Sequence, residues 1–272
     1  MPNSPMEVML AGTRLRVAPR SADERAFWET LALGVQSRGV GGGWEDETLA
    51  FVAARARPGV VFVDIGAWIG PVSLLAARLG ARVVALEPDP VARASLEENF
   101  ALNGLRAEVI PAALHSDGDG LTLYGGRKGL GASMTSALGV HRGEPVHVST
   151  VTPAEVADRA GPGAALMKVD IEGHEYAMAP RLAELRARLG GEEGAALHLS
   201  LHPRQLWKKL RRDWTLFARR KAFEATREAL AAFGDAPMRV SGETEPLTPE
   251  RLRARFGPGY AGNRNFAVEI GG

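Results

Sequence analysis

The sequence predicts an α/β protein with a doubly wound, Rossmann-like sheet. The first observation is the segment Val61–Gly70, VFVDIGAWIG, which is typical of a buried strand followed by a glycine turn that opens a helix. The second is Val83–Pro90, VVALEPDP, which indicates another buried strand that ends in an acid. Three strand–helix units in a row favour parallel strands with right-handed crossovers.

Composition sets the size and the general class of the protein. A chain of 272 residues with 45% hydrophobic content favours one domain over residues 57–272, with residues 1–56 as hairpin and helical lid elements. Its 33 basic and 32 acidic residues nearly cancel, which argues against a nucleic-acid partner. The absence of cysteine excludes disulfides, thiolate metal sites and iron–sulfur clusters. No apolar run is long enough to span a membrane, so a cytoplasmic protein without stable membrane insertion is expected.

The first half of the chain divides into elements by its turn and capping residues. Gly12 favours a hairpin, Ser21 caps a helix with Glu24 at capping-box spacing, and Asn103–Gly104 ends another helix. The predicted elements are hairpin Met6–Val17, helices Ser21–Leu33 and Trp44–Ala56, strand Val60–Asp64, helix Pro71–Leu79, strand Arg82–Glu87, helix Pro90–Leu102 and strand Ala107–Pro111.

The second half continues the alternation after a glycine-rich stretch, Gly125–Gly143, which we interpret as a mobile loop over the site. Phe266–Ile270 alternates apolar and other residues, as expected for a C-terminal antiparallel strand that is buried on one face. The other predicted elements are a hairpin around Leu121–Tyr124, strand Val146–Val151, helix Thr152–Ala160, strand Ala165–Ile171, helix Glu175–Leu189, strand Ala195–Leu201 and an inserted helical segment over about 203–235.

The glycine spacing after the first strand bears on the cofactor. Asp64, Gly66 and Gly70 form the pattern D-x-G-x-x-x-G, which lacks the middle glycine of a dinucleotide fingerprint. Glu87 ends the second strand, where a carboxylate can accept both hydroxyls of a ribose. S-adenosylmethionine, which has no pyrophosphate, therefore fits better than NAD. An NAD-dependent oxidoreductase and a non-catalytic nucleoside-binding module stay as alternatives.

Several blocks in the same order resemble the FkbM family of S-adenosylmethionine-dependent O-methyltransferases. The most specific block is MKVDIEGHE. Trp68 stands where this family usually has asparagine, so a stacking or shielding role is expected for it. The matching blocks are Phe62–Gly70, Ala85–Pro90, Glu98–Gly104, Met167–Glu175 and Leu199–Pro203.

The resemblance implies a donor site and an acceptor class. It implies that Asp64, Gly66 and Gly70 shape the donor pocket, together with Trp68, Pro88 and Asp170. It further implies that Glu45 reaches the methionine end of the donor, Glu87 the ribose and Ala113 the adenine. Ser133 matches a serine position that touches substrate or donor. The implied acceptor is a hydroxyl on a sugar or on a glycosylated or polyketide-type natural product.

The segment after the strand Ala165–Ile171 holds the candidate catalytic groups. Lys168, Asp170 and Glu172 alternate, so an extended backbone places them on one side. His174 opens a helix, whose positive end disfavours the imidazolium, and is our first candidate for the general base. Asp170 is the second, and Glu172 is a candidate substrate contact. The alternative is structural: a helix cap at His174 and an ion pair between Lys168 and Asp170.

The same acids raise the question of a metal ion. Asp170, Glu172, His174 and Glu175 offer hard oxygens and one imidazole, which would suit Mg²⁺. Nothing in the sequence requires the ion, and we assign no residue as a metal ligand.

Beyond the acids, His202 and a basic segment carry further hypotheses. His202 precedes a proline at the end of the next strand, where it could orient substrate. Arg204–Lys221 combines an apolar stripe with a basic face that includes Arg211 and Arg212. Four interpretations stay open for this segment: a lid or homo-oligomer helix, a site for an anionic acceptor, a membrane-surface contact, and a nucleic-acid contact.

Overall fold

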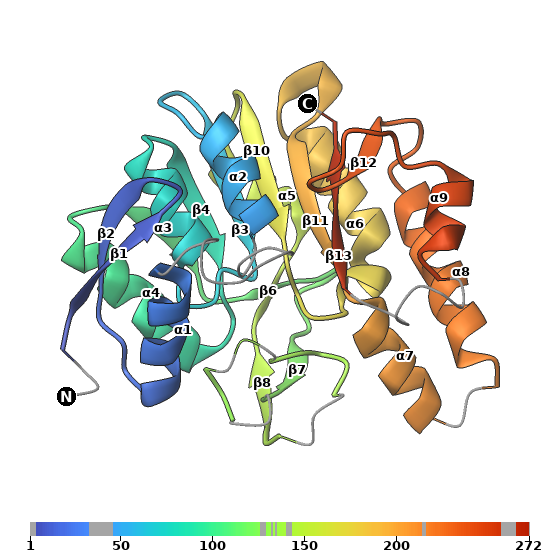
Figure 1. Ribbon diagram of the computed structural model, residues 1–272, viewed down its shortest axis with the longest axis horizontal. Coiled ribbons are helices and arrows are strands. Elements are labelled where there is room, and N and C mark those ends of the chain that lie inside the picture. Colours follow the sequence, from blue (N-terminus) through green and yellow to red (C-terminus); the bar gives the residue numbers. More distant parts are fainter. Residues whose placement is uncertain are drawn as a thin grey trace.

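A mixed sheet of seven strands forms the centre of the molecule (Figure 1). The computed structural model describes residues 4–32, 46–125, 129–131, 133, 135–139, 143–213, 216–256 and 265–271. The sheet consists of β3 (Val61–Ile65), β4 (Arg82–Leu86), β5 (Ala107–Ile110), β10 (Ala165–Val169), β11 (Ala196–Leu201), β12 (Met238–Val240) and β13 (Phe266–Ile270).

The strand order confirms the predicted doubly wound architecture. Across the sheet the order is β12-β13-β11-β10-β3-β4-β5. The strands from β5 to β11 are parallel, whereas β13 runs antiparallel to both β11 and β12. The order reverses between β3 and β10, because the chain builds β3, β4 and β5 outward and then returns to β10 on the other side. Such a switch point is where a doubly wound sheet opens a crevice for ligands.

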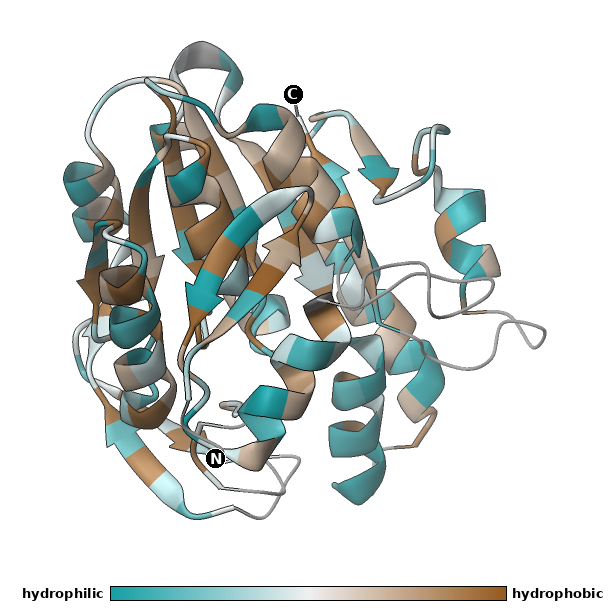
Figure 2. Cartoon of the chain, turned by 60° about the vertical axis from the view of Figure 1, so that its left-hand side comes forward, coloured by the Kyte–Doolittle hydropathy of each residue, from teal (hydrophilic) through white to brown (hydrophobic). Residues whose placement is uncertain are grey.

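Helices cover both faces of the sheet, which explains why its central strands are almost continuously apolar. One face carries α2 (Asp46–Arg55), α3 (Pro71–Arg78) and α4 (Pro90–Leu102), packed on strand side chains such as Phe62. The other carries α5 (Pro153–Ala160), α6 (Glu175–Arg188) and α8 (Ala218–Ala231), packed on Val63 and its neighbours. The apolar strands lie between more hydrophilic helices (Figure 2).

The N-terminal elements belong to one of these two cores. β1 (Met6–Leu10) and β2 (Thr13–Val17) form the predicted hairpin, and α1 (Ala22–Ala32) follows it. Leu15 and Trp28 are fully buried and share a core with the side chains of α3 and α4. The hairpin lies beside these two helices in Figure 1.

Short strands and further helices complete the fold. β6 (Ala113–Leu114) pairs with β9 (Thr150–Val151), and β7 (Leu121–Tyr124) pairs with β8 (Pro145–Val148). The single strand predicted over Val146–Val151 is therefore two strands, because its two halves pair with different partners. The predicted helical segment contains α7 (Pro203–Arg212) and α8, and α9 (Pro249–Ala254) comes later. Within the described residues, no helix has both the length and the apolar character needed to cross a bilayer.

Candidate functional site

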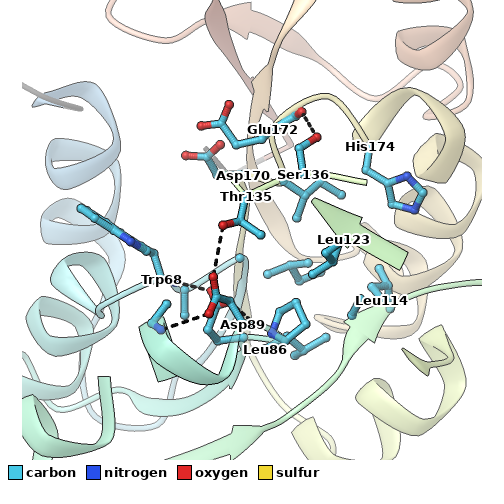
Figure 3. Close-up of a pocket in the computed structure, with 18 of the residues that line it drawn as sticks. Trp68, Leu86, Asp89, Leu114, Leu123, Thr135, Ser136, Asp170, Glu172 and His174 are labelled. Carbon is cyan, nitrogen blue, oxygen red and sulfur yellow. Dashed lines mark hydrogen bonds between the residues drawn. The ribbon is translucent and has the colours of Figure 1, made fainter. Parts of the chain in front are cut away.

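A pocket opens at the carboxyl ends of the parallel strands, beside the switch point between β3 and β10 (Figure 3). Its walls come from the turns after β3, β4 and β10, from β6 and β7, and from the segment around Ser136. Of the predicted site residues, the pocket is lined by Gly66, Trp68, Glu87, Pro88, Ala113, Ser133, Asp170, Glu172 and His174.

The turn after β3 needs glycine at position 66. Gly66 has a φ of 82°, in the left-handed region, and a Cβ there would lie 2.0 Å from the backbone oxygen of Asp170. The N–H groups of Gly66 and Ala67 both donate to the carbonyl of Leu86, which ties the turn to the end of β4. The backbone of this turn is therefore held against both neighbouring strands.

Glu87 is buried at the floor of the pocket and is not a surface acid. Its side chain accepts hydrogen bonds from the backbone N–H of Trp68, at 2.6 Å, and from that of Asp89, at 2.8 Å. Burial raises the pKa of Glu87 to about 7, against the lowering effect of these two donors. The carboxyl group is thus poised between its charged and neutral forms near neutral pH.

Asp89 lines the same pocket but was not among the predicted site residues. Its Oδ1 accepts from the N–H of Val91 at 2.9 Å and so caps α4. Its Oδ2 accepts from Gly131 N–H at 2.6 Å and from the Thr135 hydroxyl at 3.1 Å. An aspartate directly before Pro90 was a recognisable helix-cap signal. The contacts of Asp89 with Gly131 and Thr135, about 40 residues away, could not be predicted from the neighbouring sequence.

Trp68 contacts both Glu87 and the segment at Gly131 at the pocket wall. Its backbone N–H reaches Glu87, its indole N–H donates to the carbonyl of Gly131 at 2.8 Å, and its ring meets Phe27 edge-on at 4.5 Å. The bond to Glu87 comes from the backbone N–H, so it does not depend on which side chain stands at position 68.

Asp64 and Gly70 are not among the residues that line the pocket. Asp64 is fully buried, where it accepts from the Ser73 hydroxyl at 2.6 Å and pairs with the Lys168 ammonium at 3.1 Å. Gly70 has a φ of 91°, and a Cβ there would lie 2.4 Å from Leu96. In this structure both residues support the turn from behind. Glu45 lies outside the described residues.

Asp170 and Glu172 lie in the turn after β10. The Glu172 backbone has a φ of 52°, which is uncommon for a residue with a side chain, and the Ser136 hydroxyl donates to its carbonyl at 2.8 Å. Burial is the main cause that raises the pKa of Glu172 to about 7, and nearby His202 opposes that rise. Figure 3 shows Asp170 and Glu172 close together at one end of the pocket.

His174 lines the pocket apart from these two carboxylates (Figure 3). Its ring stacks on that of His115, with centroids 5.9 Å apart, and its buried Nε2 makes no hydrogen bond with any described residue. Burial, and then the proximity of His115, lowers the pKa of His174. The neutral ring that was predicted is thus favoured, but the main cause is burial and not the end of the helix.

His202 is buried next to the pocket and does not line it. Glu175 Oε1 accepts from the His202 backbone N–H at 2.7 Å and lies 3.1 Å from its Nδ1. Burial alone would lower the pKa of His202, but Glu175, followed by Asp170 and Glu172, raises it to about 10. Sequence spacing predicted the position of this histidine near the acids but not its contact with Glu175.

Arg211 and Arg212 lie in the last turn of α7 and are not pocket residues. The Arg211 guanidinium stacks over the Trp207 ring at 4.8 Å. Arg212 donates to the carbonyl of Gly139 and so connects α7 to the segment after Ser136. The basic end of α7 is exposed.

Residues 64–179 match the model of the methyltransferase FkbM domain. No curated protein matches the chain. The chain is similar to the solved structure of a precorrin-6y C5,15-methyltransferase from Geobacter metallireducens, at 15% identity, 88% coverage of this chain, 95% of that one, and a TM-score of 0.41.

Two further solved structures are similar over nearly the whole chain. One is a putative S-adenosylmethionine-dependent methyltransferase from Streptococcus mutans, with 10% identity and a TM-score of 0.47. The other is a Thermus thermophilus 16S rRNA N2 G1207 methyltransferase, with 12% identity and a TM-score of 0.45. This chain is covered to 99% in both, and spans 56% and 50% of their lengths.

The family match covers the turn after β3, Glu87 and the acidic turn after β10, which are the main walls of the pocket. It agrees with the resemblance seen in the sequence blocks. Residues 64–179 therefore carry a match to a methyltransferase FkbM domain, which supports an S-adenosylmethionine-dependent methyltransferase activity.

Proposed function

We propose that the chain methylates a hydroxyl oxygen of a small molecule, most simply a sugar or a glycosylated or polyketide-type natural product. The methyltransferase domain supports methyl transfer. The observation that carries the choice of a hydroxyl is His174, whose buried Nε2 makes no hydrogen bond with any described residue of a pocket that it lines. An acceptor hydroxyl can donate to that nitrogen once the ring turns it toward the pocket.

The donor occupies the part of the pocket nearest β3 and β4 in this proposal. Glu87 accepts the ribose hydroxyls, since its buried carboxylate lies beside the turn at Gly66. Ala113 flanks the adenine, and Trp68 shields the donor from water. Glu45 keeps its proposed role at the methionine end of the donor.

The transfer is an in-line displacement at the methyl carbon. The bond from the acceptor oxygen to the methyl carbon forms as the bond from that carbon to the sulfonium sulfur breaks. The products are a methyl ether and S-adenosylhomocysteine, and the hydroxyl proton passes to His174 Nε2. Asp170 and Glu172, which line the same pocket, contact the acceptor, and His202 acts behind them as a positioning residue.

Replacement of His174 by glutamine tests this proposal. We expect His174→Gln to reduce methyl transfer at least about 100-fold, which is the usual contribution of a general base, and to leave donor binding unchanged. Turnover is measured by mass spectrometry with a panel of hydroxylated sugars and metabolites, and donor binding by calorimetry. His147→Gln, at an exposed histidine of β8, is the matched control.

Three outcomes would contradict the proposal. A fully active His174→Gln variant would show that His174 is not the general base. Methyl groups found on nitrogen or carbon of the product would show that the enzyme is not specific for oxygen. Donor binding without turnover of any acceptor would favour a non-catalytic nucleoside-binding module, and binding of NAD in place of the donor would favour an oxidoreductase.

A further inference from the structure

Three side chains that follow two neighbouring strands meet at the edge of the pocket formed by the turn after β10. Asp170, Glu172 and His202 each offer one metal-ligating atom, and these atoms lie within 4.8 Å of one another. Asp170 follows β10 and His202 follows β11, which pair in parallel, so both residues reach the same edge of the sheet. The set differs from the one considered in the sequence, because it includes His202 and lacks His174 and Glu175.

His202 is held in the orientation that a metal-binding histidine needs. Its Nδ1 lies 3.1 Å from Glu175 Oε1, and its Nε2 faces Asp170 and Glu172. Glu175 is itself fixed, since its Oε2 accepts from the N–H of Gly173 at 2.8 Å and its side chain is fully buried. Histidines that ligate metals usually donate their second ring nitrogen to a carboxylate in this manner.

The spacing around His202 Nε2 suits ligands of one ion better than direct hydrogen bonds. Asp170 Oδ1 lies 3.4 Å from Nε2, and Glu172 Oε2 lies 3.7 Å from it. Both distances exceed the usual hydrogen-bond range. Two neighbouring ligands, each about 2.1 Å from an ion, lie roughly 3.0–3.4 Å apart, depending on whether the coordination is octahedral or tetrahedral. Small side-chain rotations would bring all three atoms onto one cation.

Gln205 is a second observation that does not depend on the acids. Its side chain is 94% buried, since its exposed fraction is 6%. Its amide nitrogen donates to Glu172 Oε2 at 3.2 Å, and its amide oxygen is buried without a hydrogen-bond partner among the described residues. The amide nitrogen of Gln205 thus reaches this cluster, and the oxygen of the same amide is a buried acceptor that a water molecule of a hydrated cation could satisfy.

We propose that Asp170, Glu172 and His202 bind a divalent cation at the acceptor end of the pocket. Two carboxylates and one imidazole are a mixed set that suits Mn²⁺ and its neighbours. Asp170 and Glu172 also line the pocket, so the open positions of the ion would face an acceptor hydroxyl. This last role rests on the proposed function, whereas binding of the ion does not.

Binding of Mn²⁺ to the full chain, after treatment with a chelator, tests the site directly. We expect one bound Mn²⁺ per chain in an electron paramagnetic resonance titration, with a nitrogen coupling from His202 in the pulsed spectrum. Asp170→Asn and His202→Gln should each weaken binding at least about tenfold, and the second should abolish the nitrogen coupling. Asp119→Asn, at an exposed acid, is the control and should bind Mn²⁺ like the wild type.

The outcomes separate this proposal from the proposed function. No Mn²⁺ binding by the wild type, or binding without nitrogen coupling, would overturn the metal site even if the variants failed to fold. Binding that survives both substitutions would also overturn it. Methyl transfer that is insensitive to chelators, together with no bound Mn²⁺, would reject the site and leave the methyltransferase intact. Bound Mn²⁺ without methyl transfer to any hydroxyl would support the metal site and reject the proposed function.

Discussion

If Glu87 accepts the donor ribose as proposed, its charge links donor binding to pH. Burial raises its pKa to about 7, so the free protein holds this carboxyl partly protonated at neutral pH. The ionised form accepts two ribose hydroxyls better than the neutral form, which has lost acceptor capacity. In the proposed role, donor binding is therefore expected to favour loss of the proton, so that affinity rises with pH.

We expect the dissociation constant for S-adenosylmethionine to be about tenfold larger at pH 6 than at pH 8, as linkage to one group with this pKa requires. Calorimetry at both pH values measures it. Glu87→Gln should bind weakly and without this pH dependence, whereas Glu97→Gln, at an exposed acid of α4, should keep the wild-type profile. Equal affinity of the wild type at both pH values would contradict the ribose role.

Local signals predicted the pocket residues more readily than their partners. Gly66, Glu87 and the acids after β10 follow strands, so the sequence placed them at one edge of the sheet. The contact of Glu175 with His202 joins residues 27 positions apart, and no spacing rule encodes it. The pKa directions of Glu87 and His174 depend mainly on burial, which one sequence does not specify.

The basic end of α7 is a positively charged surface near the pocket. Its arginines are exposed, and Arg212 reaches the segment after Ser136, which lines the pocket. A positive surface at this position would attract an anionic acceptor through long-range forces that salt weakens.

We expect Arg211→Glu with Arg212→Glu to raise the acceptor KM several-fold at low salt and to leave kcat nearly unchanged, because the charges act on encounter and not on the reaction. Initial rates at two salt concentrations measure the effect. Arg219→Glu with Arg220→Glu, on α8, makes the same change in net charge and is the control. Kinetics that do not change in the α7 variant would favour a structural role for this helix.

Helix and strand boundaries followed from the sequence where caps and periodicity agree. The helix predicted from Thr152 is α5, whose capping box consists of Thr152 and Glu155, and Pro90 opens α4 as predicted. The strand predicted over Val146–Val151 was wrong as a single element. Its two halves, β8 and β9, belong to different small sheets, because β8 pairs with β7 and β9 pairs with β6. Both partners lie far from this strand in the sequence.

At the scale of the whole molecule, one buried ion pair joins the two halves of the sheet. Lys168 of β10 and Asp64 of β3 face each other in register, with side chains 5% and 0% exposed. The Lys168 ammonium also donates to the carbonyl of Gly66 at 2.7 Å. If the Lys168 ammonium is removed, the negative charge of the buried Asp64 carboxylate is left without a neighbouring positive charge.

We expect Lys168→Met to lower the free energy of unfolding by about 3–5 kcal/mol, since it leaves the Asp64 charge buried. The double variant Asp64→Asn with Lys168→Met should recover part of that loss. Urea denaturation measures both. Arg188→Met, which breaks an exposed pair with Glu184, should cost less than about 1 kcal/mol. A double variant as unstable as Lys168→Met alone would show that the charge is not the cause.

The class of the fold was predictable because alternating strands and helices constrain a parallel sheet. The place of the N-terminal hairpin was not, since Leu15 and Trp28 would suit any apolar surface and the structure buries them in the core of α3 and α4. The predicted division of the chain at residue 56 is not tested by these contacts and stays a prediction.

The position of β13 affects how this protein assembles during synthesis. β13 lies between β11 and β12, so β12 joins the sheet only through a strand that the ribosome makes after it. Until residues 266–270 emerge, the outer edge of β11 stays open, and an open strand edge can pair with another nascent chain. The sheet therefore closes late in translation, and slow synthesis after β11 would lengthen the time during which chaperones must protect that edge.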